Sequence, residues 1–181
     1  MYEKFGQFID GKWQASSNKE TYEVINPANE EVIGRASKAT PEDVDRALRS
    51  AAKGLEVWRQ TSPWKRSYII RKIADKMREK QDILAKWMTL EVGKPFNEAK
   101  GEVGGSADIF EWNAEETKRI YGQTVESRFV DTRVHVYYQP VGVVAALTPW
   151  NFPLVLSSRK ISTALAAGCS VIVKPDVITP G

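Results

Sequence analysis

The sequence predicts an α/β protein with parallel strands, mainly because of the pattern near its C-terminal end. Two continuous apolar runs, residues 141–147 and 170–173, flank a helical pattern that begins at Pro153 and ends before Gly168. Continuous apolar runs are typical of strands covered on both faces, and proline and glycine at these positions mark a helix start and end. This order of elements predicts a right-handed β-α-β crossover.

The composition is that of a folded globular domain. Of the 181 residues, 42% are hydrophobic and 27% are charged, which favours neither a disordered nor a fibrous class. A formal net charge of +3, dispersed along the chain, is too small to indicate a nucleic-acid partner. The N-terminus has no apolar segment of signal-peptide length, and no apolar run is long enough for a membrane span. We therefore expect a cytoplasmic protein without a membrane partner.

The chain contains a single cysteine, Cys169, and a single histidine, His135. One cysteine excludes an internal disulfide, and the pair is too few for a Cys/His zinc site, so no metal is expected. Cys169 stands between Gly168 and an apolar run, which favours a core thiol.

Short strands are expected at the start of the chain, followed by three helices. The Asp-Gly pair in FIDGKW suits a hairpin turn, and the Asn-Pro pair after YEVI ends an extended segment. A Thr-Pro pair at 40–41 and a Ser-Pro pair at 62–63 each combine a hydroxyl N-cap with proline at the first helical position. The second helix is expected to continue to Gly93, and a third to run from about 95 to 120.

The third helix contains Gly101, Gly104 and Gly105, which reduce helix propensity. We interpret them as a sign of close packing against a neighbouring element.

Residues 122–140 change to an alternation of period two. In RVHVYYQP, Val134 and Val136 fall on one face of a strand, and Arg133 and His135 fall on the other. His135 is therefore expected to be a surface strand residue rather than a catalyst. A pair of strands with one apolar face has to bury it, and a pair that projects from the body would bury it against another subunit.

Two polar residues follow the strands of the crossover. Asn151 comes just after the first strand and Lys174 just after the second, and ligands of open parallel sheets bind at these carboxyl ends. Asn151 is either a helix cap or a donor to an oxygen that develops negative charge. Lys174 is either a solvated charge or a donor to a ribose or phosphate. No G-x-G-x-x-G follows the first strand, so a dinucleotide would be held in an unusual way.

Several motifs in a fixed order resemble the NAD(P)-dependent aldehyde dehydrogenase superfamily over almost the whole chain. They are FIDGKW, INPANEEVIG, EVGKP, YGQT, PWNFP followed by RK, ALAAGCSVIVKP and TPG. The resemblance implies a partial aldehyde dehydrogenase fold, with a Rossmann-like parallel sheet, N-terminal strands and helices, and a projecting oligomerisation hairpin. It also implies oxidation of an aldehyde to an acid through a cysteine thiohemiacetal, with hydride transfer to NAD or NADP.

The same resemblance implies a domain organisation. Residues 1–121 and 141–181 would be the N-terminal part of the NAD(P)-binding domain, and residues 122–140 would be the oligomerisation strands of a homodimer or homotetramer. In the family, the nucleophilic cysteine and the general-base glutamate lie beyond the segment that this chain matches. We therefore expect an N-terminal portion that lacks the catalytic domain and is inactive alone.

Individual roles follow from the matched motifs. In the family, the asparagine that Asn151 matches donates its amide to the hemiacetal oxyanion, and the loop matched by Thr148, Pro149 and Trp150 borders the cofactor. The lysine that Lys174 matches contacts the adenosine ribose. The residues expected to bind the cofactor are Thr148, Pro149, Trp150, Asn151, Lys174, Asp176 and Val177.

The sequence leaves both NAD and NADP as possible coenzymes. Many NAD-preferring members have a glutamate where this sequence has Val177, and an apolar residue removes both the ribose acceptor and the repulsion of a 2′-phosphate. Asp176, one position earlier, would restore some of that repulsion.

Arg159 indicates the substrate class. It matches an arginine that holds the distal carboxylate in succinate-semialdehyde dehydrogenases, and a guanidinium can bind a carboxylate with two hydrogen bonds. The sequence KRIYGQT also resembles that subgroup. Succinate semialdehyde or a related carboxylated semialdehyde is the expected small-molecule substrate, and an ordinary exposed helical arginine is the alternative.

Two other functions fit parts of the sequence. The chain could be a non-catalytic interaction or remnant polypeptide that binds through its helices and strand pair. It could also be a simple nucleotide-binding module, although the missing glycine fingerprint disfavours this.

Overall fold

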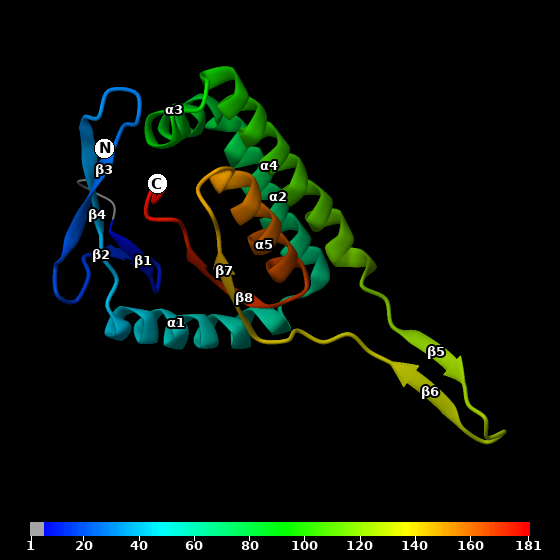
Figure 1. Ribbon diagram of the computed structural model, residues 1–181. Helices are drawn as coiled ribbons and strands as arrows, with labels where there is room; N and C mark the ends of the chain where they lie inside the picture. Colours follow the sequence, from blue (N-terminus) through cyan, green and yellow to red (C-terminus); the bar gives the residue numbers. More distant parts are fainter. Residues whose placement is uncertain (1–5) are drawn as a thin grey trace.

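The computed structural model of the chain describes residues 6–181, and the first five residues of the N-terminal segment lie outside it. The strands are β1 (Gln7–Ile9), β2 (Lys12–Gln14), β3 (Thr21–Ile25), β4 (Val32–Ser37), β5 (Gln123–Glu126), β6 (Arg133–Val136), β7 (Val143–Leu147) and β8 (Ser170–Lys174). The helices are α1 (Pro41–Gln60), α2 (Pro63–Glu79), α3 (Gln81–Val92), α4 (Phe96–Glu116), the 3-10 helix η2 (Thr117–Arg119) and α5 (Pro153–Ala166). Figure 1 shows their arrangement.

The β-α-β crossover is confirmed. Strands β7 and β8 pair in parallel, in a register that places Val143 opposite Ser170 and Leu147 opposite Lys174. Helix α5 connects them, with Pro153 in its first turn and Gly168 after its end at a φ of 89°. The carboxyl ends of the two strands therefore lie side by side.

The expected cover on both strand faces is wrong for this chain. Leu147 is 63% exposed and Val173 39% exposed, although α5 and α1 pack against the two strands. Every sheet formed by residues 6–181 has two strands, so the Rossmann-like sheet of the prediction is represented only by β7 and β8. A pair of strands has two outer edges and too few neighbours to bury both faces, which leaves apolar side chains in solvent.

A layer of helices forms the main core. Helix α4 packs against α2, α3 and α5, and the buried side chains between them are Ile70, Ala74, Met77, Ala85, Met88, Ala99, Val103, Ala107, Phe110, Ala114 and Ala166. Alanine predominates, which allows helix backbones to approach closely. The Nε1 of Trp58 in α1 donates a hydrogen bond of 2.9 Å to the carbonyl of Leu165, which ties α1 to the end of α5.

The two predicted helix starts are confirmed. Thr40 caps α1 in a capping box with Asp43, and the hydroxyl of Ser62 accepts from the backbone of Lys65 in α2. The predicted second helix is not continuous. It is interrupted at Lys80, which separates α2 from α3. Both helices pack on α4. The third helix ends as expected, with η2 after α4.

The interpretation of the α4 glycines is wrong. A Cβ atom added at Gly101 or Gly105 would have no neighbour within 4 Å, and one at Gly104 would meet only the Gln81 side chain at 3.7 Å. Close packing on α4 comes instead from its alanines and Val103, which are fully buried.

The N-terminal strands form two hairpins that are anchored to α1. Asp10 and Gly11 take positive φ values between β1 and β2, as the expected tight turn requires. The buried carboxylate of Asp43 accepts hydrogen bonds from the side chain of Gln7 and from the backbone of Ser17 and Thr40. Burial would raise the pKa of Asp43, but these bonds and the paired Arg46 hold it below its usual range.

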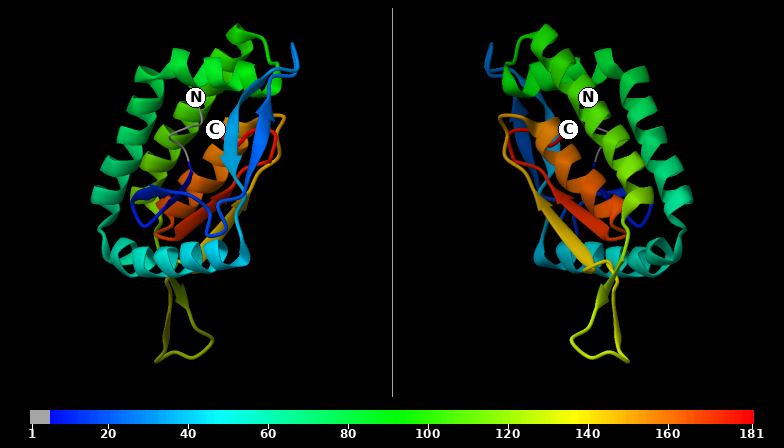
Figure 2. Two further views of the ribbon diagram at one scale, coloured as in Figure 1. Left: turned by 90° about the vertical axis from the view of Figure 1, so that its left-hand side faces the viewer. Right: turned by 90° about the vertical axis from the view of Figure 1, so that its right-hand side faces the viewer.

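The strand pair β5–β6 projects from the body, as Figures 1 and 2 show. Val125 lies opposite Val134, and Val136 is on the same strand as Val134; all three are more than a third exposed. His135 is exposed on β6 and lies 3.1 Å from the Thr124 hydroxyl, which confirms it as a surface strand residue.

The glycine environments give a test of stability. Gly101→Ala should raise the free energy of unfolding by about 0.5–1 kcal/mol, because alanine favours the helix and meets open space. Gly168→Ala should lower it, since φ there is +89° and the new Cβ would come within 2.9 Å of Pro140. Urea unfolding of the two variants measures both effects, and equal signs would contradict the assignment.

Candidate functional site at the ends of β7 and β8

The carboxyl ends of β7 and β8 bring Thr148 and Lys174 next to each other. The backbone N–H of Thr148 donates to the carbonyl of Lys174 at 3.3 Å, directly after the last paired residues. The Lys174 side chain is exposed, and within residues 6–181 its ammonium has no ion-pair or hydrogen-bond partner. It is therefore available to a ligand at this edge of the sheet.

Asn151 does not cap the following helix. The N-cap of α5 is Phe152, and no side chain from that position bonds to the helix. Asn151 is exposed, and its side-chain amide has no partner in the part of the chain that the structure describes. Of the two alternatives for Asn151, a helix cap and a donor to a negative oxygen, the structure excludes the helix cap. The amide remains with free donors.

A carboxylate from another helix caps α5 instead. The Oε1 of Glu102, on α4, accepts hydrogen bonds from the backbone N–H groups of Leu154 at 3.0 Å and Val155 at 3.1 Å. These amides are among the donors that a helix N-terminus offers to a phosphate. Because Glu102 already occupies them, α5 does not offer them to a cofactor pyrophosphate, in keeping with the missing glycine fingerprint.

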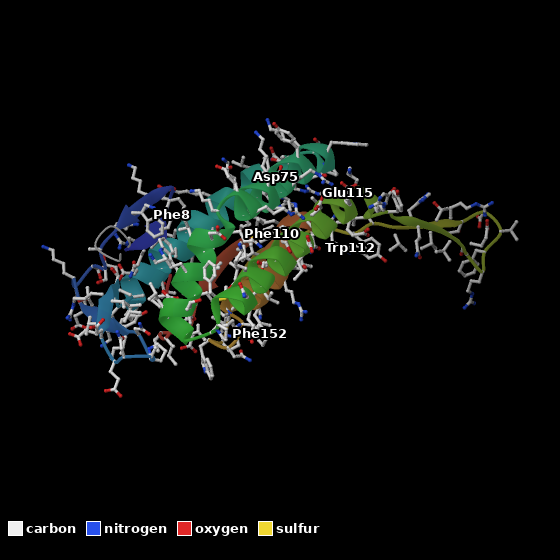
Figure 3. The ribbon with its side chains drawn as sticks, turned by 90° about the horizontal axis from the view of Figure 1, so that it is seen from above. Phe8, Asp75, Phe110, Trp112, Glu115 and Phe152 are labelled. Carbon is white, nitrogen blue, oxygen red and sulfur yellow. The ribbon has the colours of Figure 1, made fainter. Side chains whose placement is uncertain are left out.

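Lys94 completes the arrangement. Its ammonium pairs with the Oε2 of Glu102, donates to the backbone carbonyl of Asn151 at 3.0 Å, and lies 3.9 Å from the ring centroid of Phe152. The side chains of Lys94 and Glu102 are only 10% and 2% exposed. Figure 3 shows Phe152 at the rim of the body, away from the projecting hairpin.

The sequence alone gave no role to either member of this pair. Lys94 occurs in the EVGKP motif and Glu102 in the glycine-containing stretch of α4. The local signal is Gly93, which ends α3 in the left-handed conformation at a φ of 75° and turns the chain so that Lys94 lies between α3 and α4.

The loop before Asn151 is only partly buried. Thr148 is 7% exposed, and the Ser157 hydroxyl, which donates to the carbonyl of Pro153, lies 3.3 Å from the Thr148 hydroxyl. Pro149 is exposed, and Trp150 is 48% exposed. These two side chains form a surface next to the Asn151 amide.

The segment after β8 has an internal structure of its own. Asp176 accepts the backbone N–H of Ile178 at 3.0 Å, so part of its carboxylate serves a local turn. Burial and the nearby Asp176 raise the pKa of Tyr22 on β3, which places this carboxylate close to the N-terminal strands. Val177 is 56% exposed and presents an apolar surface beside Lys174.

Arg159 and Cys169 take different positions. Arg159 is exposed on α5, and among the described residues its guanidinium has no partner. Cys169 is 2% exposed, which confirms it as a core thiol.

Residues 6–181 offer neither a metal site nor a membrane-spanning helix. These residues contain no cluster of three or more His, Cys, Asp or Glu side chains that could hold a metal ion. No helix among them has the length and apolar character needed to cross a lipid bilayer.

The family model described as the aldehyde dehydrogenase family matches residues 13–181. The chain belongs to the aldehyde dehydrogenase family. A glutarate-semialdehyde dehydrogenase of Pseudomonas putida is 46% identical over 96% of this chain and 36% of its own length. A succinate-semialdehyde dehydrogenase of Escherichia coli, whose name specifies NADP(+), is 45% identical over 95% of this chain and 36% of its length.

The structural comparison agrees. A crystal structure of a betaine aldehyde dehydrogenase mutant from Staphylococcus aureus, in complex with NAD+, matches with a TM-score of 0.94 and 40% identity. The match covers 98% of this chain and 36% of the other. The aldehyde dehydrogenase segment described here therefore spans about a third of the length of these relatives, and it corresponds to their N-terminal portion.

Glu91, which begins the EVGKP motif, is a buried carboxyl with one described hydrogen bond. It is 3% exposed, and it accepts the backbone N–H of Gly181 at 3.1 Å. Burial raises the pKa of Glu91 to about 7, although this bond acts in the opposite direction.

A pH dependence of stability follows. The folded state favours protonated Glu91. The stability that this group contributes is therefore fully present below the pKa of Glu91 in the unfolded chain, and it is lost as the pH rises toward 7. Glu91→Gln should remove this loss and stabilise the chain at pH 8 by up to about 3 kcal/mol. Denaturant unfolding between pH 5 and 8 measures the difference, with the exposed Glu98→Gln as the control. A constant difference between wild type and Glu91→Gln over this range would refute the assignment.

Proposed function

We propose that the chain is the N-terminal portion of an NAD(P)-dependent aldehyde dehydrogenase in which Asn151 stabilises the oxyanion of the thiohemiacetal. The proposal rests on the exposure of the Asn151 amide and on the contact of its backbone carbonyl. Its amide is exposed and has no partner among residues 6–181, while Lys94 donates a hydrogen bond to its backbone carbonyl at 3.0 Å. A donor that is fixed through its backbone and free at its amide suits an oxygen that becomes negative during a reaction.

The chemistry requires groups that residues 1–181 do not supply. A cysteine thiolate adds to the aldehyde carbon, and the carbonyl oxygen then takes the negative charge that the Asn151 amide would stabilise. Cys169 cannot be that nucleophile, because it is buried in the core. We therefore expect the nucleophile and the general base in the part of the relatives that this chain does not match.

The residues near the strand ends fit the adenosine side of a dinucleotide. The unpaired ammonium of Lys174 would donate to the ribose, and exposed Val177 would lie beside it without an acceptor for the ribose hydroxyls. Thr148, Pro149 and Trp150 would border the bound cofactor. NAD or NADP, when bound, supplies the hydride acceptor. The apolar Val177 favours acceptance of NADP, whereas the carboxylate of Asp176, which accepts a hydrogen bond within its own turn, would repel a 2′-phosphate.

A semialdehyde with a distal carboxylate is the proposed substrate class. Arg159 presents an exposed guanidinium without a protein partner within the described residues. A planar guanidinium can bind a carboxylate with two parallel hydrogen bonds. Both semialdehyde dehydrogenases reported above are named for dicarboxylate semialdehydes, whereas the relative from Staphylococcus aureus is named for betaine aldehyde. The proposed substrate class therefore rests on Arg159 and not on the percentage of sequence identity to these relatives.

The projecting hairpin supports a second, compatible function. We propose that residues 122–140 are oligomerisation strands and that 1–121 and 141–181 belong to the NAD(P)-binding domain of a cytoplasmic homo-oligomer. The exposed valines of β5 and β6 favour burial against another subunit. If the chain acts only as an interaction polypeptide, size-exclusion chromatography with the full-length enzyme should give a stable mixed oligomer.

The oxyanion role is tested in an enzyme completed with the C-terminal two thirds of the Escherichia coli relative. Asn151→Ala should lower kcat by about 10²-fold or more, because one oxyanion donor is lost. Steady-state NAD(P)H formation measures it, and the 181-residue chain alone should show no aldehyde-dependent signal. A change below threefold would exclude Asn151 as the donor.

The substrate class is tested with Arg159→Ala in the same enzyme. The variant should raise KM for succinate semialdehyde and glutarate semialdehyde by at least tenfold, because the carboxylate loses its charged partner. KM for an aliphatic aldehyde of similar length should change little. Lys160→Ala, at the neighbouring exposed position, is the matched control. Equal effects on both kinds of aldehyde would remove the case for a carboxylate site.

A further inference from the structure

We propose that the buried Lys94–Glu102 pair is a positioning device that sets the Asn151 amide for catalysis, an inference that rests on the function proposed above. Neither residue contacts the reacting atoms in this proposal. Both act through the backbone of the loop that carries Asn151, so they are positioning residues.

The contacts of the pair converge on one short segment. Lys94 contacts the carbonyl of Asn151 and the ring of Phe152, and Glu102 accepts the N–H groups of Leu154 and Val155. Apart from their bond to each other, every described polar contact of these two side chains is with residues 151–155. An ion pair that served only to stabilise α4 would not need this set of contacts.

The pair also replaces a local cap. Helix α5 begins with Phe152 at the N-cap, and neither this residue nor the following Pro153 has a side chain that can accept a hydrogen bond. The first turn of α5 therefore depends on Glu102 from α4 for its cap. The loop between β7 and α5 is fixed at its end by this carboxylate and at Asn151 by Lys94.

Burial makes the arrangement stiff. With side chains 10% and 2% exposed, the two charges are little screened by water, so each requires the other. Since a misplacement of about 1 Å can cost about 10² in rate, a device that fixes the Asn151 backbone should affect kcat more than substrate binding.

The chain contains another lysine–carboxylate pair, which is more exposed, at 36% and 73%, and lacks these contacts. Lys100, also from the EVGKP–α4 region, pairs with Asp82 at 2.7 Å and lies 5.8 Å from the ring centroid of Phe96. It therefore has a carboxylate and an aromatic ring as partners, as Lys94 does, but it contacts neither Asn151 nor the start of α5. Lys100→Met removes a lysine of the same type without touching the loop.

The test is a double-mutant cycle in the completed enzyme. Lys94→Met should lower kcat by about tenfold or more with less than a threefold change in KM, while Lys100→Met should change kcat by less than twofold. In an Asn151→Ala background, Lys94→Met should have almost no further effect on kcat, because the group it positions is gone. Thermal unfolding of each variant separates loss of fold from loss of rate.

The outcomes separate the two proposals. If Asn151→Ala lowers kcat but Lys94→Met does so by less than twofold, or by the same factor in both backgrounds, the positioning role is overturned and the oxyanion role stands. If Asn151→Ala has no effect, both fail. Should Lys94→Met not fold, Lys94→Met/Glu102→Gln keeps an uncharged acceptor for Leu154 and Val155, and the same cycle is measured with it.

Discussion

The candidate site depends on one interaction, the buried pair between Lys94 and Glu102. It joins the turn after α3 and the first half of α4 to the start of α5, which lies more than fifty residues further along the chain. An unpaired charge at either position would be costly at this depth, so the pair and the loop that it contacts form as one unit. The backbone carbonyl of Asn151 is thus held by a lysine from the turn between α3 and α4, a region that contains none of the predicted site residues.

The same pair determines what the first crossover can bind. In many dinucleotide-binding folds the helix after the first strand offers its N-terminal amides to a pyrophosphate. Here two of those amides donate to Glu102, while the side chains of Asn151, Lys174 and Arg159 have no partner in the described part of the chain. The edge formed by β7 and β8 is suited to contact a cofactor through side chains and not through a glycine-rich backbone loop.

The body of the structure shows why the strands are only half covered. Helices α2, α3, α4 and α5 make a compact core rich in alanine, whereas within residues 6–181 β7 and β8 pack mainly against α1 and α5. Leu147 and Val173 remain exposed, as does the apolar face of the β5–β6 hairpin. The relative from Staphylococcus aureus is almost three times as long as this chain. We propose that further sheet strands and another subunit cover these exposed apolar surfaces.

The sequence by itself determined the local elements and their chemistry. Boundary residues such as Thr40, Asp10 and Gly168 specify caps and turns through their own backbone and side chains, so helix starts, hairpins and the crossover could be predicted. Tertiary structure decided what depends on partners far along the chain. Helices α2 and α3 separate at Lys80, Gly101 and Gly105 face open space, and the cap of α5 comes from Glu102. None of these leaves a periodic signal, because each is set by which helix packs beside which.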